Sequence, residues 1–317
     1  MSVCIVIATE HDLHADSVVD RLRGKSQIIR IDPLNYIPSL SFRSESSKCQ
    51  IGDIRFHLND VTGIICRVAL ESVSLEFLVD PVQKFAAREH LDALIGVLLN
   101  IPETKWINFP WNDSIADGKI YPLILAARAG IRVPPFVVSS NRKYLFEFDS
   151  LCGPSIIKPL SDMSIARQAG RFVEIPEMAE FDAPYTTDFD PGRLMDGEAE
   201  DETPTLVQKK IQKRGDVRVV VVDRQVFASY MPKKHSIVDS RMAKERDEFV
   251  FYLDAGLSEN IIHLTHNILN LRFATMDFIH GIDDVLYLVD VNPSGNFLWQ
   301  ETMLGIPISS ALSEGLL

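Results

Sequence analysis

The chain has 317 residues, of which 46% are hydrophobic and 24% charged, and its formal net charge is −12. This length suits two domains or three small ones, and the composition is that of a globular protein rather than a disordered one. No basic surface is available to displace the counterions of a nucleic acid, so we expect no nucleic-acid partner.

The start of the chain and its cysteines bear on its location. MSVCIVIATE has no basic region before its short apolar run, so we expect a first strand rather than a signal peptide. No stretch approaches the roughly 20 apolar residues that cross a bilayer, which predicts no membrane partner. The four cysteines lack CxxC spacing, and Cys4 and Cys66 lie in apolar runs that are typical of buried thiols. We therefore expect a cytoplasmic protein.

Strand and helix patterns alternate over the first hundred residues. Apolar, β-rich runs predict strands at 3–8, 28–31, 51–58 and 61–67, and helical spacing predicts helices at 14–22 and 81–99. This alternation predicts an N-terminal, doubly wound parallel α/β domain over residues 1–110. The first strand is not followed by GxGxxG, and the chain has no GxxxxGK[ST] loop, so neither common nucleotide fingerprint is present.

The remaining elements are more mixed. Strands are expected at 106–110, 136–139 and 155–158, with a helix at 117–129 that ends at Gly130. Residues 174–202 hold eleven acidic residues against one arginine, which predicts an acidic loop over 174–204. This loop is either a mobile lid or a solvated insertion without a role. Further strands are expected at 206–212, 217–222, 226–230, 273–279 and 285–291, and a helix at 259–269.

The last two predicted strands each carry a carboxylate, Asp277 and Asp290, among apolar residues. A buried, unpaired carboxylate costs several kcal/mol, so each needs a cation or strong donors. A four-residue turn at 281–284 would place Asp277 opposite Leu288, with Asp290 on the same face about 8 Å away. With Asn292, the pair would form an oxygen site that suits Mg²⁺. Alternatively, Asp277 caps a turn and Asp290 pairs with a lysine, or an odd turn puts the two on opposite faces.

Three basic residues occupy positions that are unusual for surface charges. Lys119 lies at the expected start of a helix, where the helix dipole disfavours a cation. Lys158 ends a buried strand, and Arg218 lies in an apolar strand two residues after Asp216. Each could face a phosphate. Alternatively, the lysines are surface residues and Arg218 pairs with Asp216 or lies at a sheet edge.

Four segments, taken in order, resemble the ATP-grasp superfamily and, within it, the microviridin-type peptide ligases. They are WINFPWNDSIADGKIYPLILAARAGIRVPPFVVSSN, SIIKPL, LVQKKIQKRGDVRVVVV and MDFIHGIDDVLYLVDVNPSGNFLWQE. The final IPISSALSEGLL resembles the closing helix of that branch. The resemblance implies an α/β (α+β) ATP-grasp fold, in which the 1–110 domain precedes a central domain over 111–205 and a C-terminal domain over 206–317.

The resemblance also implies roles for individual residues. Phosphate contacts would come from Lys119 and Lys158, and Mg²⁺ ligands from Asp277, Asp290 and Asn292. A hinge segment would bind adenine through backbone groups, and it comprises Gln208, Lys209, Lys210 and Ile211. Asp216 would bind the ribose, Arg218 the transferring phosphate, and Arg241 would steady the acyl phosphate. Asp290 departs from the usual glutamate and Lys209 from the common acidic residue, while Arg67 is the one arginine left of a more basic motif.

The implied activity is an ATP-dependent ligase that joins a carboxylate to an amine or hydroxyl through an acyl phosphate, releasing ADP and phosphate. The substrate implied is a ribosomally made precursor peptide that gains side-chain ester or amide crosslinks, as in natural-product macrocyclisation. Two alternatives remain: a ligase of free amino acids or another small-molecule carboxylate, and an inactive nucleotide-binding partner protein. A homodimer is compatible with the sequence, which does not fix the oligomeric state.

Overall fold

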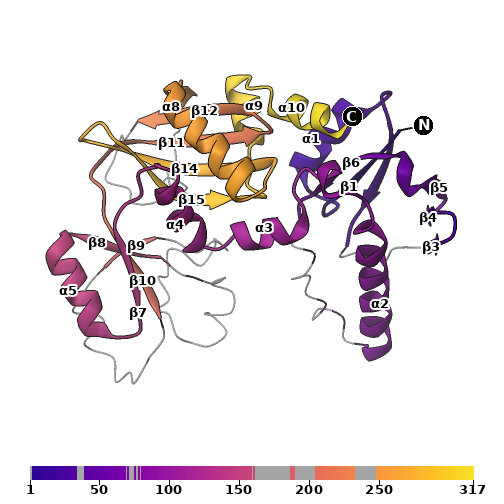
Figure 1. Ribbon diagram of the computed structural model, residues 1–317, viewed down its shortest axis with the longest axis horizontal. Coiled ribbons are helices and arrows are strands. Elements are labelled where there is room, and N and C mark those ends of the chain that lie inside the picture. Colours follow the sequence, from indigo (N-terminus) through magenta and orange to yellow (C-terminus); the bar gives the residue numbers. More distant parts are fainter. Residues whose placement is uncertain are drawn as a thin grey trace.

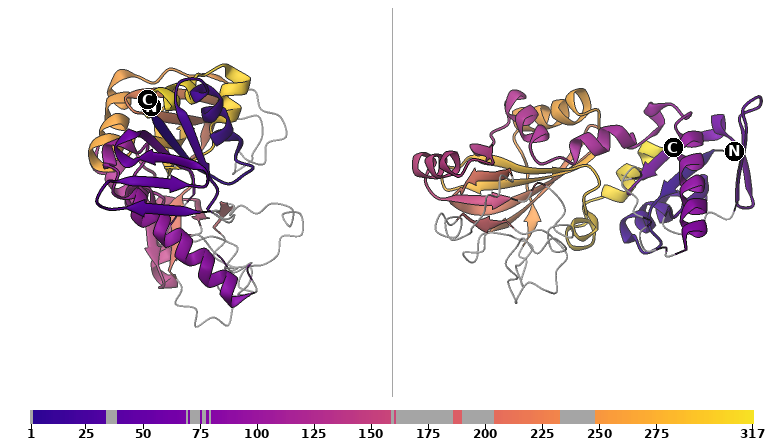
Figure 2. Two further views of the ribbon diagram at one scale, coloured as in Figure 1. Left: turned by 90° about the vertical axis from the view of Figure 1, so that its right-hand side faces the viewer. Right: turned by 90° about the horizontal axis from the view of Figure 1, so that it is seen from below.

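The computed structural model describes residues 2–33, 39–68, 70, 75, 78, 80–158, 160, 186–189, 204–232 and 248–317. A parallel sheet with its helices occupies one end of the molecule, and two antiparallel sheets occupy the other (Figure 1). Both chain termini lie at the end with the parallel sheet, as the two rotated views in Figure 2 also show. None of the helices among the described residues is both long and apolar enough to cross a membrane.

The N-terminal parallel sheet has the order β2–β1–β6, with β1 (Val3–Ile7) at its centre between β2 (Gln27–Ile31) and β6 (Val61–Cys66). Every residue of β1 is buried, as expected for a strand covered on both faces. The helices α1 (Leu13–Leu22) and α2 (Pro81–Leu98) complete the predicted alternation. Because β2 and β6 flank β1 on opposite sides, the carboxyl ends of β1 and β6 form a topological switch point, where α/β sheets bind ligands.

One prediction in this domain is wrong. The strand expected at 51–58 is a hairpin within a small antiparallel sheet of β3 (Leu40–Arg43), β4 (Lys48–Ile51) and β5 (Ile54–His57). The chain turns at Gly52, whose φ of 58° lies in the left-handed region that glycine adopts without strain. A short 3₁₀ turn at Leu58–Asp60 then leads into β6.

The central antiparallel sheet has the order β7–β10–β8–β9. Its strands are β7 (Phe136–Ser139), β10 (Thr205–Lys209), β8 (Ser155–Lys158) and β9 (Thr187–Asp188). The bounds of β7 and β8 are those predicted. Helix α5 (Arg142–Cys152) covers one face, where Leu145 packs against Val207 and Phe189. The opposite face, which carries alternate residues such as Gln208, is turned away from α5.

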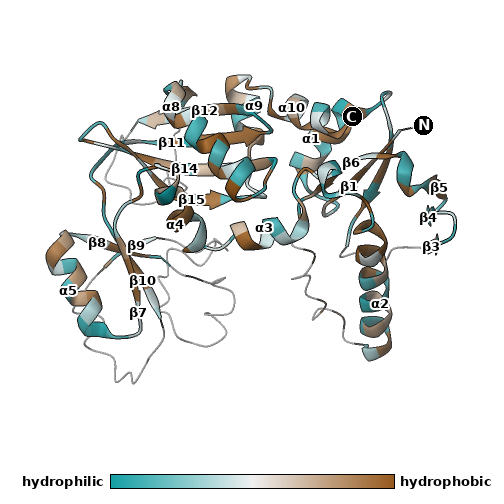
Figure 3. Ribbon diagram, viewed as in Figure 1, coloured by the Kyte–Doolittle hydropathy of each residue, from teal (hydrophilic) through white to brown (hydrophobic). Residues whose placement is uncertain are grey.

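The C-terminal antiparallel sheet has the order β13–β12–β11–β14–β15. Its strands are β13 (Phe249–Val250), β12 (Gln225–Pro232), β11 (Lys213–Val222), β14 (Phe273–Gly281) and β15 (Leu286–Asn292). Hydrophobic residues dominate these strands (Figure 3). The sheet carries α8 (Ala255–Ile262), which continues as a π-helix over His263–Ile268, so the predicted 259–269 helix is longer and begins earlier.

The segment between the parallel sheet and the central sheet differs from the prediction. Instead of a strand at 106–110, Trp106 and Asn108 each make an isolated bridge, and a 3₁₀ turn at Glu103–Lys105 precedes them. Helix α3 (Pro110–Ala116) begins at a proline, whose fixed φ suits the first helical turn. The predicted helix at 117–129 is α4 (Tyr121–Arg128), so Lys119 lies in the turn before it.

The last two helices, α9 (Leu298–Leu304) and α10 (Ile308–Leu316), join the two ends of the molecule. Leu312 of α10 packs in one core with Val6 of the parallel sheet and Val220 of the C-terminal sheet. The predicted closing helix is confirmed as α10. Because its residues pack against both sheets, α10 holds the parallel sheet beside the C-terminal one. The division at residues 110 and 205 stays a prediction, with 205 falling at the first residue of β10.

Candidate active site

The β14–β15 hairpin brings Asp277 and Asp290 directly opposite each other. The predicted register, with Asp277 opposite Leu288, is wrong, because the connection spans residues 281–285, five rather than four, between the paired His280 and Leu286. A turn of odd length alone would have put the two carboxylates on opposite faces of the sheet.

A β-bulge restores the alignment. Phe278 pairs with Leu288, whereas the next pair is Asp277 with Asp290, so Val289 is the extra residue. The Val289 carbonyl accepts a hydrogen bond from Lys158 Nζ at 2.8 Å. Lys158 is the last residue of β8 in the central sheet. Its side chain therefore reaches from the central sheet to the C-terminal sheet and contacts the bulge beside the carboxylate pair.

Both carboxylates pair with predicted phosphate-binding cations. Arg218 of β11 pairs with Asp277 of β14. Its Nη1 donates to both carboxylate oxygens of Asp277, at 2.7 and 2.8 Å. Lys119 Nζ lies 2.9 and 3.0 Å from the two oxygens of Asp290. The alternative in which Asp290 pairs with a lysine is therefore what the structure has, and that lysine is Lys119. The alternative partner for Arg218, Asp216, instead pairs with Lys213 at 2.8 Å.

Asn292 is the last residue of β15. Residues 293–297, which connect it to α9, are here called the β15–α9 loop. The Asn292 Oδ1 atom accepts a hydrogen bond from Ser294 N at 3.0 Å, which orients the side-chain amide. Ser294 Oγ in turn donates to Asp113 of α3 at 3.0 Å. A Cβ on Gly295 would lie 1.8 Å from Thr275 Oγ1, so only glycine fits this close approach to β14.

Two carboxylates and an amide oxygen form a donor set that fits Mg²⁺, which takes few protein ligands and keeps water or phosphate oxygens. Among the described residues, no group of three or more histidine, cysteine, aspartate or glutamate side chains could hold a metal. A metal at Asp277, Asp290 and Asn292 would thus need further oxygens, which water or a phosphate would supply.

The predicted hinge lies where β10 ends. The Lys209 amide donates to Pro135 O at 2.9 Å and the Lys210 amide to Pro154 O at 2.8 Å, so these two groups are engaged within the protein. The Lys210 side chain pairs with Asp188. The Gln208 side chain is fully buried, and neither of its amide atoms has a hydrogen-bond partner. A buried orphan amide costs about 1–3 kcal/mol, so a polar group that reached Gln208 would recover this free energy. The role of Gln208 in a hinge stays a prediction.

The likeness to solved structures extends over the whole chain. The macrocyclase MdnC of Microcystis aeruginosa MRC, solved with the precursor peptide MdnA, has a TM-score of 0.78 and 19% identity over 100% of this chain and 99% of that one. A RiPP-associated ATP-grasp ligase from Chryseobacterium gregarium, solved with ADP and a leader and core peptide, has a TM-score of 0.78 and 19% identity. The match covers 100% of this chain and 96% of that one. The RimK domain protein ATP-grasp of Sphaerobacter thermophilus DSM 20745 has a TM-score of 0.57 and 14% identity over 99% of both chains.

The chain has the ATP-grasp fold. No family model and no curated protein matches the sequence. In this ATP-grasp fold the residues predicted for phosphate and metal, Lys119, Lys158, Arg218, Asp277 and Asp290, lie within one connected set of contacts. The predicted Arg241 and most of the acidic segment 174–204 lie outside the described residues.

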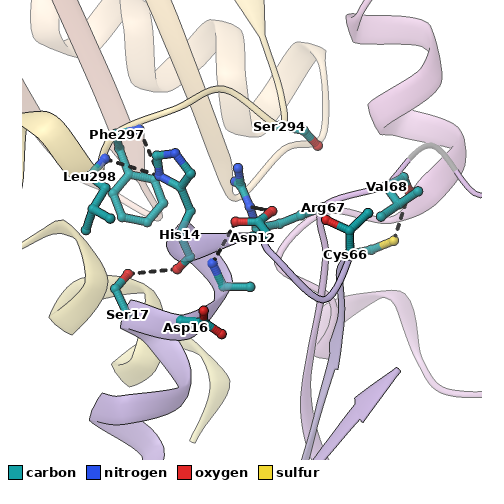
Figure 4. Close-up of polar contacts among 12 residues, drawn as sticks. Asp12, His14, Asp16, Ser17, Cys66, Arg67, Val68, Ser294, Phe297 and Leu298 are labelled. Carbon is teal, nitrogen blue, oxygen red and sulfur yellow. Dashed lines mark hydrogen bonds and ion pairs between the residues drawn. The ribbon is translucent and has the colours of Figure 1, made fainter. Parts of the chain in front are cut away.

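Apart from Arg67, sequence reasoning missed the residues of a second cluster, at the switch point of the parallel sheet (Figure 4). Asp12 caps α1 and accepts from Arg67 Nε at 2.8 Å, and the Arg67 guanidinium lies 5.9 Å from the centre of the Phe297 ring. Burial alone would raise the pKa of Asp12, but Arg67 holds it below its ordinary value. His14 Nδ1 accepts from the backbone amides of Phe297 and Leu298, at 3.3 and 3.2 Å.

The charge state of His14 follows from its contacts. A ring nitrogen that accepts two N–H donors carries no proton, so this imidazole is neutral. Burial, together with the positive charges of Arg67 and Arg218 and against the opposing effect of Asp12, lowers the pKa of His14 to about 4. The sequence signal available was the histidine that opens the predicted 14–22 helix just after the first strand, to which we assigned no role.

Proposed function

We propose that the protein is an Mg²⁺- and ATP-dependent ligase that activates a carboxylate as an acyl phosphate, and that its substrate is a ribosomally made precursor peptide. The observation that carries this proposal is the opposed Asp277–Asp290 pair, in which each carboxylate touches a cation from a different element. Opposed carboxylates repel each other, and fold stability alone gives no reason to place them on facing strands.

Structural neighbours support the choice of substrate. The ligase PsnB, whose structure with a minimal precursor has a TM-score of 0.75 and 20% identity to this chain, has also been solved with Mg, ADP and precursor. MdnC and the Chryseobacterium gregarium ligase likewise carry precursor or leader and core peptides. By this likeness we assign a peptide substrate, with side-chain ester or amide crosslinks as the product.

The proposed mechanism relies on positioning and charge rather than on a protein acid or base. Asp277, Asp290 and Asn292 would hold Mg²⁺, which when bound offsets the negative charge of the phosphates. Lys119, Lys158 and Arg218 would exchange their present protein acceptors for phosphate oxygens, with Arg218 on the transferring phosphate, and so hold the nucleotide in line with the substrate. The substrate carboxylate then attacks the γ-phosphorus, ADP leaves, and an amine or hydroxyl attacks the acyl carbon as phosphate departs.

The test is ADP formation and product mass in the presence of ATP, Mg²⁺ and a co-expressed precursor peptide. We expect Asp277→Ala and Asp290→Ala each to lower the rate of ADP formation at least a hundredfold, since removing one charge-stabilising group from a phosphoryl-transfer site costs about 3 kcal/mol. Asp284→Asn is the matched control, because Asp284 lies in the same hairpin but its side chain is 72% exposed.

Mass spectrometry separates the substrate classes. Loss of one water mass per bond from the precursor supports the crosslinking activity, whereas added mass on a free amino acid would assign the protein to the small-molecule ligases. Turnover in either alanine variant equal to that of the unmodified protein would overturn the metal and phosphate assignment.

A further inference from the structure

The β15–α9 loop is held by contacts from several parts of the chain. Asn108 Nδ2 donates to Pro293 O at 3.0 Å, and Asp113 accepts from Ser294, so the first half is fixed beside α3. The second half contains the peptide group between Asn296 and Phe297, and this group is bound at both of its ends.

At one end, Arg218 Nη2 donates to the Asn296 carbonyl at 3.1 Å. At the other, the Phe297 amide donates to His14 Nδ1 at 3.3 Å. A peptide group is a rigid plane, so its carbonyl and its N–H move together. The position of the acceptor that Arg218 uses is therefore set in part by His14, a residue of α1 that lies 283 positions earlier in the chain than Phe297.

Two further contacts of the imidazole make His14 a firm support. Its ring packs edge-on against the Phe297 ring, with centroids 4.9 Å apart, and it also accepts from Leu298, the first residue of α9. Its own carbonyl accepts from Ser17 Oγ at 2.7 Å. The charged groups that face it are Asp12 and Arg67 of the switch-point cluster and Arg218 of β11.

We propose that His14 is a positioning residue through which the N-terminal domain aligns Arg218 for the transferring phosphate. The inference rests on the proposed function, since it takes Arg218 as a phosphate contact. Arg218 has another contact, with Asp277, and its Nε is buried without a partner, so its guanidinium has few constraints besides Asp277 and the Asn296 carbonyl. Loss of the His14 contact would leave the carbonyl free to shift and the guanidinium free to follow.

The experiment measures the binding of two probes, ADP and the non-hydrolysable ATP analogue AMPPNP, each with Mg²⁺, by isothermal titration calorimetry. His14→Leu removes the acceptor, and we expect AMPPNP to bind roughly three- to tenfold more weakly, the value of one or two hydrogen bonds, with ADP affinity unchanged. His14→Asn places Oδ1 where Nδ1 was and should restore AMPPNP binding. His14→Gln, a polar residue whose amide lies further out, should behave like His14→Leu and serves if the leucine variant does not fold.

Ser17→Ala is the matched control, since it removes a hydrogen bond to His14 O without altering the imidazole. The inference is overturned if His14→Leu and His14→Gln bind AMPPNP as the unmodified protein does, or if ADP and AMPPNP weaken equally, which is what general loosening of α1 would cause. If the unmodified protein binds neither nucleotide, the proposed function itself fails, and this inference fails with it.

Discussion

Replacing Asp290 with asparagine separates the stability of the hairpin from its proposed role in holding Mg²⁺. Asp277 and Asp290 are directly opposite, which in antiparallel sheets places their Cα atoms about 4.5–5.5 Å apart. Two unit charges about 5 Å apart repel by roughly 1 kcal/mol in water and about 3 kcal/mol at the dielectric of a protein surface. The side chains of Asp277 and Asp290 are 44% and 31% exposed, so the lower figure applies.

The Asp290→Asn change also removes an ion pair. Lys119 and Asp290 are each about one third exposed, and pairs of this kind contribute up to about 1 kcal/mol. The lost pair and the relieved repulsion nearly cancel, so without metal we expect the free energy of unfolding to change by less than about 1 kcal/mol. With ADP present and Mg²⁺ at a hundredfold excess over its dissociation constant, the unmodified protein gains about 2.7 kcal/mol, and the variant loses this gain.

The assay is urea unfolding with ADP, in Mg²⁺ and in EDTA, for the unmodified protein, Asp290→Asn and the Asp284→Asn control. The control should keep the full Mg²⁺-dependent gain. The reasoning is refuted if Asp290→Asn keeps that gain, or if it loses more than about 2 kcal/mol in EDTA, because Asp290 would then be a structural residue.

Three other changes test separate features. Gln208→Met replaces an orphan amide by an apolar chain of similar length, so we expect urea unfolding without nucleotide to show a gain of about 1 kcal/mol and calorimetry to show weaker ATP binding; a loss of stability would contradict this. The pKa of His14 is about 4 in the folded state and 6.5 in the unfolded state. The neutral imidazole therefore stabilises the fold above pH 6.5, and this stabilisation is lost as the pH falls toward 4. Between pH 7 and pH 5 the free energy of unfolding of the unmodified protein should fall by about 1–2 kcal/mol more than that of His14→Asn, and parallel pH profiles of the two proteins would contradict this. Gly63→Ala would place a Cβ 2.5 Å from the Leu316 backbone, so it should cost about 2 kcal/mol and expose α10 to hydrogen exchange, and unchanged protection of α10 would count against this packing.

Local patterns in the sequence were enough to predict several strands and the acidic pair. The bounds of β7 and β8 follow from the prolines, glycines and polar residues that flank short apolar runs. Asp277 and Asp290 could be identified because a charge inside an apolar strand needs a partner. Neither inference requires knowledge of distant parts of the chain.

The contacts that complete the site could not be predicted in this way. The bulge at Val289 adds one residue to a strand whose hydrophobic pattern shows no break, so loop length alone gave the wrong register. His14 lies at the start of a helix that was predicted, but nothing local indicates a partner 283 residues away. Long-range partners are a property of the packed fold, which a single sequence does not reveal at individual side chains.

The three proposed phosphate-binding cations all have protein acceptors in this structure: Asp290 for Lys119, Asp277 for Arg218 and the Val289 carbonyl for Lys158. A nucleotide that draws these cations away leaves two opposed carboxylates uncompensated, and a metal that takes the carboxylates leaves the cations uncompensated. Binding either one alone therefore costs free energy that binding both does not, so Mg²⁺ and nucleotide should bind cooperatively, with each raising the affinity of the other by the same factor. Titration of AMPPNP with and without Mg²⁺, and of Mg²⁺ with and without AMPPNP, measures that factor. For Asp290→Asn we expect it to fall toward one, and a factor equal to that of the unmodified protein would show that the coupling does not arise from this exchange of partners.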